Sequence, residues 1–347
     1  MRRMTSLCSA LALAVAITGA ITGAANVAVA APAPPAMTYR AEASIPLPDG
    51  RWDLLSVDAD HRRVVIARGD SVSVVDIATG TARSIGAIDR GHAALAVPGT
   101  HTIAVTSGKD NTLRLLNADD GHEIAKIPVG DDPDAAIWDP AARRIVVMNA
   151  KGGTVSVVDP VAIRVETSIA VKPALELAVM IAPGLMAIND EDANEIELVD
   201  LTRGVALAPI ALNGCEGPTG IAFAPDANLL LSACANGKAA LVDVRTRKLV
   251  KLLPIGAGPD TALYDAARRR FLVPCGKSAT LSVFALNRHG AITPLAPVPT
   301  EIGARTGAIG PDGRIYLPTA RFLPAEAGKR PDMVPGSAHL IVLVPTG

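Results

Sequence analysis

The sequence predicts an all-β fold, a seven-bladed β-propeller with four-stranded blades. The first observation is a repeated segment: residues 72–76 read VSVVD, and the same five residues return at 155–159. The second is the spacing of related segments, which end at positions 76, 117, 159, 200, 243, 285 and 344, so that five of the six steps are 41 to 43 residues. A period in the low forties, built from short β-type segments, is typical of propellers, and seven copies predict seven blades.

Each period reads as four strands, a to d, separated by turn residues. In the fifth period we expect strands at 217–224, 229–235, 239–244 and 249–255. In the third period we expect them at 134–139, 144–149, 154–159 and 166–171. An Asp ends several c strands and is followed by a polar or glycine-containing turn. This arrangement predicts that the Asp side chain caps the c–d hairpin.

The seventh period has candidates for strands a, b and c (306–309, 314–318 and 338–344) but none for strand d. Residues 39–47 have strand character and precede the first a strand. We expect them to pair with residues 340–344 as the outer strand of the last blade, which removes a free sheet edge. The one long step, of 59 residues, contains a Pro- and Gly-rich insertion at 321–337. This insertion is interpreted as a loop and not as an eighth blade.

Residues 1–30 are typical of an export signal. Arg2 and Arg3 precede an apolar run at 7–20, and residues 28–30 (AVA) provide a small-x-small cleavage pattern. A membrane anchor is the alternative, and the short apolar run disfavours it. We expect residues 31–38 to form an extended leader and residues 39–347 to form a single propeller domain. The predicted location is therefore periplasmic or secreted.

The composition fits one large β domain filled by aliphatic side chains, since 49% of the residues are hydrophobic and only 3% are aromatic. Without Arg2 and Arg3, the 33 basic residues become 31 against 34 acidic residues, a formal net charge of −3. A weakly acidic chain with few aromatic residues lacks the features that bind nucleic acid, so such a partner is not expected.

Export places three cysteines, Cys215, Cys234 and Cys275, in an oxidising compartment. Folding the a–b hairpin about residues 225–228 brings Cys234 near Thr219, and Cys215 lies in a Gly- and Pro-containing loop that can curl back toward it. Cys234 and Cys275 occupy equivalent points of adjacent blades, too far apart for a Cα separation of ~6 Å. We therefore expect a disulfide between Cys215 and Cys234. Three buried thiols are the alternative.

The loops before the a strands and the b–c loops share one mouth of a propeller channel. The residues just before the a strands are Asp53, Ala93, Asp134, Glu176, Thr219, Asp260 and Arg305, and His92 lies beside Ala93. The b–c loops add Arg68, Lys109, Lys151, Lys277 and Arg321, with Asp190, Glu191 and Asp192 on the acidic side. We call the following seven residues the mouth ring: Asp53, His92, Asp134, Glu176, Thr219, Asp260 and Arg305. Four acids beside one Arg favour a ligand-binding site that tolerates cations. Ion pairs that lock one blade to the next are the structural alternative.

The histidines do not form a recognisable catalytic or metal motif. Four of the six are expected in turns on the far face: His61, His101, His122 and His289. His92 and His339 are expected near the mouth. No two histidines have ligand spacing, and the sequence contains no Ser-centred elbow, phosphate-binding Gly-rich loop or Cys-x-x-Cys-His. We therefore expect no metal and no cofactor. A metal bound by His92 with Asp53 or Asp134 is the alternative.

Four segments carry a resemblance to a known family: 215–220 (CEGPTG), the 255–260 junction, 303–306 (GART) and 315–320 (IYLPTA). With them the chain resembles the YVTN-repeat, YncE-like family of exported seven-bladed propellers over essentially its whole mature length. The resemblance implies the propeller fold. One member of that family is described as DNA-binding, and others lie beside outer-membrane uptake receptors. The implied partner is therefore an envelope protein, or DNA.

These observations predict an exported, monomeric propeller that binds a small ligand or an envelope protein at the mouth ring and performs no catalysis of its own. The first alternative is a lactonase- or hydrolase-type enzyme that uses the ring acids with a divalent metal. The second is a DNA-binding propeller by analogy with the family. Bound metal would indicate the first alternative, and salt-sensitive retention on DNA would indicate the second.

Overall fold

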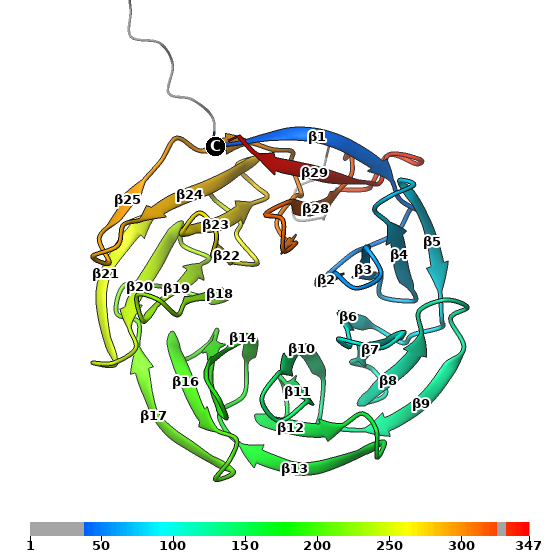
Figure 1. Ribbon diagram of the computed structural model, residues 1–347, viewed down its shortest axis with the longest axis horizontal. Coiled ribbons are helices and arrows are strands. Elements are labelled where there is room, and N and C mark those ends of the chain that lie inside the picture. The colour runs from blue at the N-terminus through cyan, green and yellow to red at the C-terminus, as the bar shows by residue number, and fades with distance from the viewer. Residues whose placement is uncertain (1–37, 325–330, 347) are drawn as a thin grey trace, which may run out of the picture. The chain divides into compact units, whose positions relative to one another are not determined.

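The structure is a computed structural model that describes residues 38–324 and 331–346. The described residues contain strands and turns but no helix, and the strands form seven antiparallel sheets arranged as blades around a channel (Figure 1). The predicted fold class is therefore confirmed. The predicted export signal at 1–30 lies outside the described residues. So does all of the predicted leader except Thr38. Within the described part, no helix is long and apolar enough to span a membrane.

The first three blades each consist of four consecutive strands. Blade 1 contains β2 (Leu55–Asp58), β3 (Arg63–Ala67), β4 (Val72–Asp76) and β5 (Thr81–Ile85). Blade 2 contains β6 (Gly91–Ala96), β7 (Thr102–Ser107), β8 (Thr112–Asn117) and β9 (Glu123–Pro128). Blade 3 contains β10 (Pro133–Asp139), β11 (Arg144–Asn149), β12 (Thr154–Asp159) and β13 (Arg164–Ala170).

The next three blades follow the same plan. Blade 4 contains β14 (Leu175–Ala182), β15 (Leu185–Asp190), β16 (Glu195–Asp200) and β17 (Val205–Ala211). Blade 5 contains β18 (Pro218–Ala224), β19 (Leu229–Cys234), β20 (Lys238–Asp243) and β21 (Lys248–Pro254). Blade 6 contains β22 (Leu263–Asp265), β23 (Arg270–Cys275), β24 (Thr280–Leu286) and a d strand in two pieces, β25 (Ile292–Pro294) and β26 (Val298–Pro299), both paired with β24.

Blade 7 is closed by the N-terminal strand, as predicted. Its strand order is β1-β29-β28-β27, with β1 (Tyr39–Pro46) antiparallel to β29 (His339–Pro345), β28 (Ile315–Thr319) and β27 (Ala308–Ile309). The first side chain of β1 is fully buried, and the hydroxyl of Tyr39 donates a hydrogen bond of 2.7 Å to Oδ2 of Asp265 in blade 6. The start of the propeller is therefore attached to two blades.

The b and c strands are almost continuously apolar because both faces of each sheet are covered by neighbouring blades. In β11 and β12, for example, most residues are buried, whereas the peripheral β13 is largely exposed. Aliphatic residues from adjacent blades make up most of these interfaces; one such cluster joins Val146 and Val155 of blade 3 to Met186 and Val199 of blade 4. The low aromatic content is consistent with this packing.

The insertion at 321–337 folds back on itself in its described part. Phe322 and Met333 form a β-bridge, and the peptide N–H of Leu323 donates to the carbonyl of Asp332 at 2.8 Å. The Phe322 ring lies 6.2 Å from that of Trp52. The two described ends of the insertion therefore pair with each other next to blade 7.

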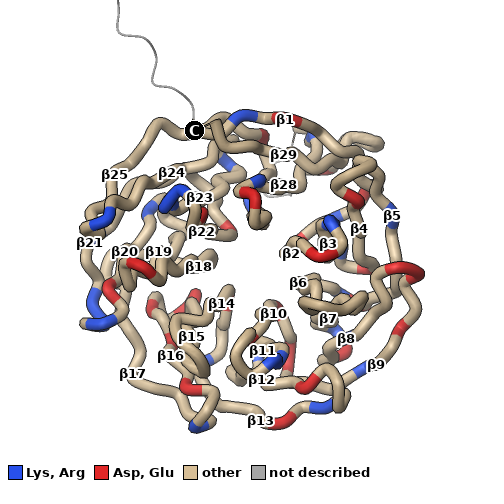
Figure 2. Tube along the Cα trace, in the orientation of Figure 1, with Lys and Arg blue, Asp and Glu red and all other residues tan. Residues whose placement is uncertain are grey.

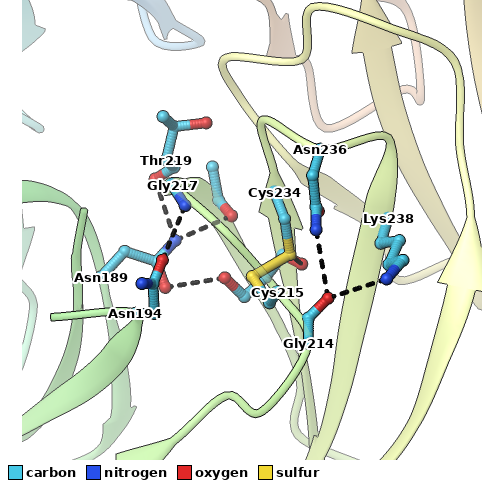
Figure 3. The surroundings of a disulfide bond; sticks show 11 residues. Asn189, Asn194, Gly214, Cys215, Gly217, Thr219, Cys234, Asn236 and Lys238 are labelled. Carbon is cyan, nitrogen blue, oxygen red and sulfur yellow. Dashed lines mark hydrogen bonds between the residues drawn. A yellow bond between two sulfur atoms is a disulfide. The ribbon is translucent and has the colours of Figure 1, made fainter. Parts of the chain in front are cut away.

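The predicted disulfide is present. Cys215 and Cys234 are bonded, with a Cα–Cα distance of 5.5 Å (Figure 3). Cys275 is free and buried. The bond joins the loop before β18 to the end of β19, so it closes the a–b hairpin of blade 5 on the side of the mouth. Burial raises the pKa of the Cys275 thiol, which therefore stays protonated and packs as a small apolar group.

Candidate functional site: the mouth ring

β-Bulges occur at four of the seven residues of the mouth ring. The pairing of four a strands with their b strands shifts at the first residues, and the shifted intervals are 91–94, 133–135, 175–178 and 218–221. These intervals contain His92, Asp134, Glu176 and Thr219. A bulge changes the direction in which a side chain points, so these four side chains leave the alternation of their strands. The other three ring residues precede the short a strands β2, β22 and β27.

The channel below the ring is largely apolar. It forms a cavity of about 330 Å³ that is lined by residues from the a strands of all seven blades. Leu54, Ala93, Ala135 and Leu177 line it, and each follows a ring residue directly in the sequence. Trp138 is the largest side chain of the lining. The mouth ring is therefore a polar collar above an apolar channel, a combination that small-molecule sites share.

His92 connects two of the ring acids. Its Nδ1 lies 3.0 Å from Oδ2 of Asp53 and 3.0 Å from Oδ1 of Asp134, and its Nε2 accepts a hydrogen bond of 3.0 Å from Nε of Arg90. Since carboxylates accept and Arg90 donates, the ring proton belongs on Nδ1. Burial alone lowers the pKa of His92, but the hydrogen bond to Asp53 and the charge of Asp134 outweigh it, and the net pKa is raised.

Arg305 pairs with Asp260 of the preceding blade. The Arg305 Nε lies 3.0 Å from Oδ2 of Asp260, and the two side chains are 48% and 20% exposed, respectively. Thr219, the uncharged member of the ring, keeps its hydroxyl oxygen buried without a hydrogen-bond partner in the described structure. Its carbonyl accepts a hydrogen bond of 3.0 Å from the amide of Asn189 in the neighbouring blade (Figure 3).

Three ring acids, Asp134, Glu176 and Asp260, have raised pKa values. Burial is the main cause for Asp134 and raises its pKa to about 6, although the charge of His92 opposes the shift. Burial likewise raises the pKa of Asp260 to about 6, although the positive charge of Arg305 opposes this shift. For Glu176, burial and then the charges of Asp134, Glu191 and Asp260 raise the pKa to about 9. At neutral pH Glu176 is therefore a neutral acid. The three remaining carboxyl groups of the ring outnumber its one permanent cation, Arg305, because His92 is neutral while its Nε2 accepts a hydrogen bond from Arg90.

Three of the five basic residues predicted at the mouth are engaged elsewhere. Arg68 is buried, and its guanidinium donates to the carbonyls of Pro48 and Gly50 at 2.6 and 2.9 Å. Lys109 and Lys151 make exposed ion pairs of 3.3 and 3.4 Å with Asp89 and Asp131, which lie in the d–a loops. These contacts tie b–c loops to d–a loops, as the structural alternative anticipates, and they leave the ring acids without those cations.

Two side-chain clusters were not predicted from the sequence. On the far face, His61 and His101 lie together, with their Nε2 atoms 3.2 Å apart and their Nδ1 atoms 2.9 and 2.7 Å from Asp58 and Asp119. The available signal was their separation of 40 residues, which is about one blade period. In blade 4, Asp190 lies with two glutamates of β16, Glu195 and Glu197. Among the described residues, this is the one group of three or more whose possible metal-ligand atoms all lie within 4.8 Å of one another.

Comparisons with known proteins support the fold. No family model and no curated protein matches the chain. Among solved structures, a chain of Kuenenia stuttgartiensis hydrazine synthase aligns with a TM-score of 0.67 and 14% identity, over 76% of this chain and 91% of that one. A chain of the mitotic checkpoint complex aligns with a TM-score of 0.71 and 14% identity, over 91% and 97%. At such identity the similarity shows the fold alone. The protein is thus a seven-bladed β-propeller.

Proposed function

We propose that this protein is a binding module that takes a small cationic ligand at the mouth ring, with an apolar part of the ligand entering the channel. The observation that carries the proposal is the raised pKa of three ring acids, Asp134, Glu176 and Asp260. Each carboxylate is costly to ionise where it stands, because burial removes water and the neighbouring acids repel it. A bound cation supplies the missing opposite charge.

The energetics of the ring favour an ammonium group over a neutral polar group. A cation placed among Asp53, Asp134 and Asp260 gains attraction from each carboxylate that it reaches, and partial burial strengthens that attraction relative to water. It also lowers the pKa of Glu176, so binding at neutral pH should release a proton. The apolar channel of about 330 Å³ then offers a place for an attached alkyl or aromatic group.

The ring geometry offers less support for catalysis. Both nitrogens of His92 are already engaged, Nδ1 by two carboxylates and Nε2 by Arg90, so neither faces a substrate as a base. The metal-assisted hydrolase therefore remains the weaker proposal. Figure 2 shows basic segments of the chain scattered around the blades and interleaved with acidic ones, a distribution that does not favour the DNA-binding alternative.

The setting that we propose is extracytoplasmic. The disulfide between Cys215 and Cys234 is compatible with an oxidising compartment, and residues 1–30 have the pattern of an export signal. The resemblance to the YVTN-repeat family suggests an envelope protein, such as an outer-membrane uptake system, as the partner that receives or supplies the ligand.

Isothermal titration calorimetry with n-hexylamine, 1-hexanol and hexanoate at pH 7.5 tests the proposed function. We expect the amine to bind at least tenfold more tightly than the alcohol, a difference of about 1.4 kcal/mol, and hexanoate to bind more weakly still. Replacing Asp134 with Asn should remove the preference for the amine. The matched control, Asp159→Asn, neutralises a half-buried acid on the far face and should leave that preference unchanged. Equal affinity for amine and alcohol would reject the proposal.

A further inference from the structure

In blade 3, a hydrogen-bonded network lies where strand b passes into strand c, and all of its members are neutral. Asn149 at the end of β11 pairs with Thr154, and its amide nitrogen donates to the hydroxyls of Thr154 and Ser156 at 3.0 and 2.9 Å. Its oxygen accepts the peptide N–H of Gly130 at 3.1 Å. Donors and acceptors are matched, and no charge is buried.

Blade 4 replaces this network with carboxylates. The strand register places Asp190 opposite Glu195 and Glu197 opposite Ile188, so these three acids stand where blade 3 has Asn149, Thr154 and Ser156. Lys172 occupies in blade 4 the position that Gly130 has in blade 3. Each residue directly follows a Val whose peptide N–H donates to a carbonyl in the b–c loop of the preceding blade. An amide and two hydroxyls can donate, whereas three ionised carboxylates cannot.

The blade-4 cluster (Asp190, Glu195 and Glu197) is consequently short of both donors and positive charge. Asp190 and Glu197 are 1% and 3% exposed, and Oδ2 of Asp190 has no hydrogen-bond partner in the described structure. Oε1 of Glu197 has no hydrogen bond there either and faces only the Lys172 ammonium, at 3.5 Å. Lys172 contacts Glu195 and lies 3.5 Å from Glu197, but it brings one positive charge to three negative ones. The Lys172 side chain is 52% exposed, so it can move into solvent.

We infer that the blade-4 cluster binds a calcium ion, which takes the place of the Lys172 ammonium. Three carboxylates and the surrounding oxygens are the hard ligands that Ca²⁺ prefers, and its flexible coordination tolerates ligands from two strands and a loop. The ion would contact Oδ2 of Asp190 and Oε1 of Glu197 and balance the excess charge. This inference does not depend on the ligand proposed for the mouth.

The position of the cluster gives such an ion a structural consequence. Its ligands flank the loop at 191–194, whose Asn194 accepts the peptide N–H of Gly217 at 2.8 Å, beside the disulfide (Figure 3). The same loop carries Glu191, whose charge contributes to the raised pKa of Glu176. Calcium would therefore fix the loop that joins blade 4 to the disulfide-bonded hairpin and to the mouth ring.

Titration of the purified, metal-free protein with CaCl₂, by calorimetry and by thermal unfolding, tests the inference. We expect saturable binding with a dissociation constant on the order of 10⁻⁴ M or below and a matching rise in Tm. The decisive variant replaces four residues, the blade-4 cluster and its lysine, with their blade-3 counterparts: Asp190→Asn, Glu195→Thr, Glu197→Ser and Lys172→Gly. The glycine is needed because a Cβ at Gly130 would lie 2.5 Å from the Thr154 hydroxyl. This variant should fold and bind Ca²⁺ at least tenfold more weakly.

Lys172→Met separates a calcium site from a purely structural ion pair. If the ammonium competes with calcium, the variant binds Ca²⁺ more tightly than the native protein does, and Ca²⁺ restores its Tm. The control Glu166→Gln removes an exposed glutamate that is paired with Arg144 and should not change calcium binding. Two results would overturn the inference. The first is no saturable binding of Ca²⁺ to the native protein below 10 mM, a concentration on the order of ten times the dissociation constant of the weakest natural calcium-binding modules. The second is undiminished binding of Ca²⁺ to the fourfold variant.

Discussion

Acidic residues at the two faces of the propeller have opposite properties. In the c–d turns, Asp76, Asp159 and Asp243 each accept two peptide N–H groups at 2.8 to 3.1 Å. Those hydrogen bonds lower the pKa of each carboxyl, and the largest contributions come from the peptide N–H groups of Thr79, Ala162 and Thr246, respectively. At the mouth, burial and mutual repulsion instead raise the pKa of Asp134, Glu176 and Asp260.

The difference separates acids that build the fold from acids that are available to a ligand. A turn acid is satisfied by its own hairpin, within three residues, and this explains its recurrence in several blades. A ring acid meets acids of other blades and few donors, so ionising it costs free energy in the folded state. Natural proteins place such costs mainly at functional sites, which is why we assign the mouth and not the far face to binding.

The largest expected effect follows from replacing Glu176 with Gln. The folded pKa of about 9 lies above the ordinary value of 4.5, so ionisation of Glu176 destabilises the folded protein increasingly as pH rises from about 4.5 to 9. The variant should be more stable than the native protein at pH 9, by at least about 1 kcal/mol or about 2 °C in Tm, and unchanged at pH 4. Thermal unfolding at both pH values measures this. A variant that is less stable at pH 9 would contradict the assigned environment.

A smaller effect of opposite sign is expected for the turn acids. The lowered pKa of Asp243 means that its charge stabilises the fold above the ordinary value of 3.8, and this contribution disappears as pH falls through the folded pKa. Asp243→Ala should therefore lower Tm at pH 7 by about 2 °C, and the loss should shrink at pH 3. Asp243→Asn should retain most of the stability because Asn117 makes the same turn contact in blade 2. An equal loss for Ala at pH 7 and pH 3 would show that the charge is not involved.

The smallest effect is expected at Arg305. Its ion pair with Asp260 is half exposed on the Arg side, so Arg305→Met should cost less than ~1 kcal/mol, while the pKa of Asp260 should rise above about 6. A double-mutant cycle with Asp260→Asn measures the coupling between the two residues. A coupling of several kcal/mol would make this pair structural, in contrast to our assignment.

The regular parts of the molecule could be predicted from the sequence because they depend on local spacing. The blade period, closure by β1 and the disulfide between Cys215 and Cys234 all follow from positions along the chain. The period also predicts which residues reach the mouth. It does not reveal side-chain direction, because a bulge shifts the register by one residue and turns a side chain to the other face. Bulges lie at His92 and Glu176, and the guanidinium of Arg68 donates to a backbone carbonyl and not to a ring acid.

Contacts between particular side chains could not be predicted from the sequence either, although one cluster has a recognisable sequence difference. Glu195 and Glu197 stand where blade 3 has Thr and Ser, a difference that is visible once the c strands are aligned. Their significance depends on the burial of Asp190 and Glu197 and on the unpaired Oδ2 of Asp190, which are properties of the folded chain. The same holds for the contact of His92 with Asp53 and Asp134.

The affinity for n-hexylamine as a function of pH tests the central claim most directly. The amine stays protonated between pH 5 and 8, whereas Asp134 and Asp260, with pKa values of about 6, change from mostly neutral to mostly ionised. Calorimetry should show affinity rising about tenfold between pH 5 and 7.5, with proton release from Glu176, and the rise should disappear in the variant Asp134→Asn/Asp260→Asn. Affinity that is independent of pH, or greater at pH 5, would contradict binding by the acidic mouth ring.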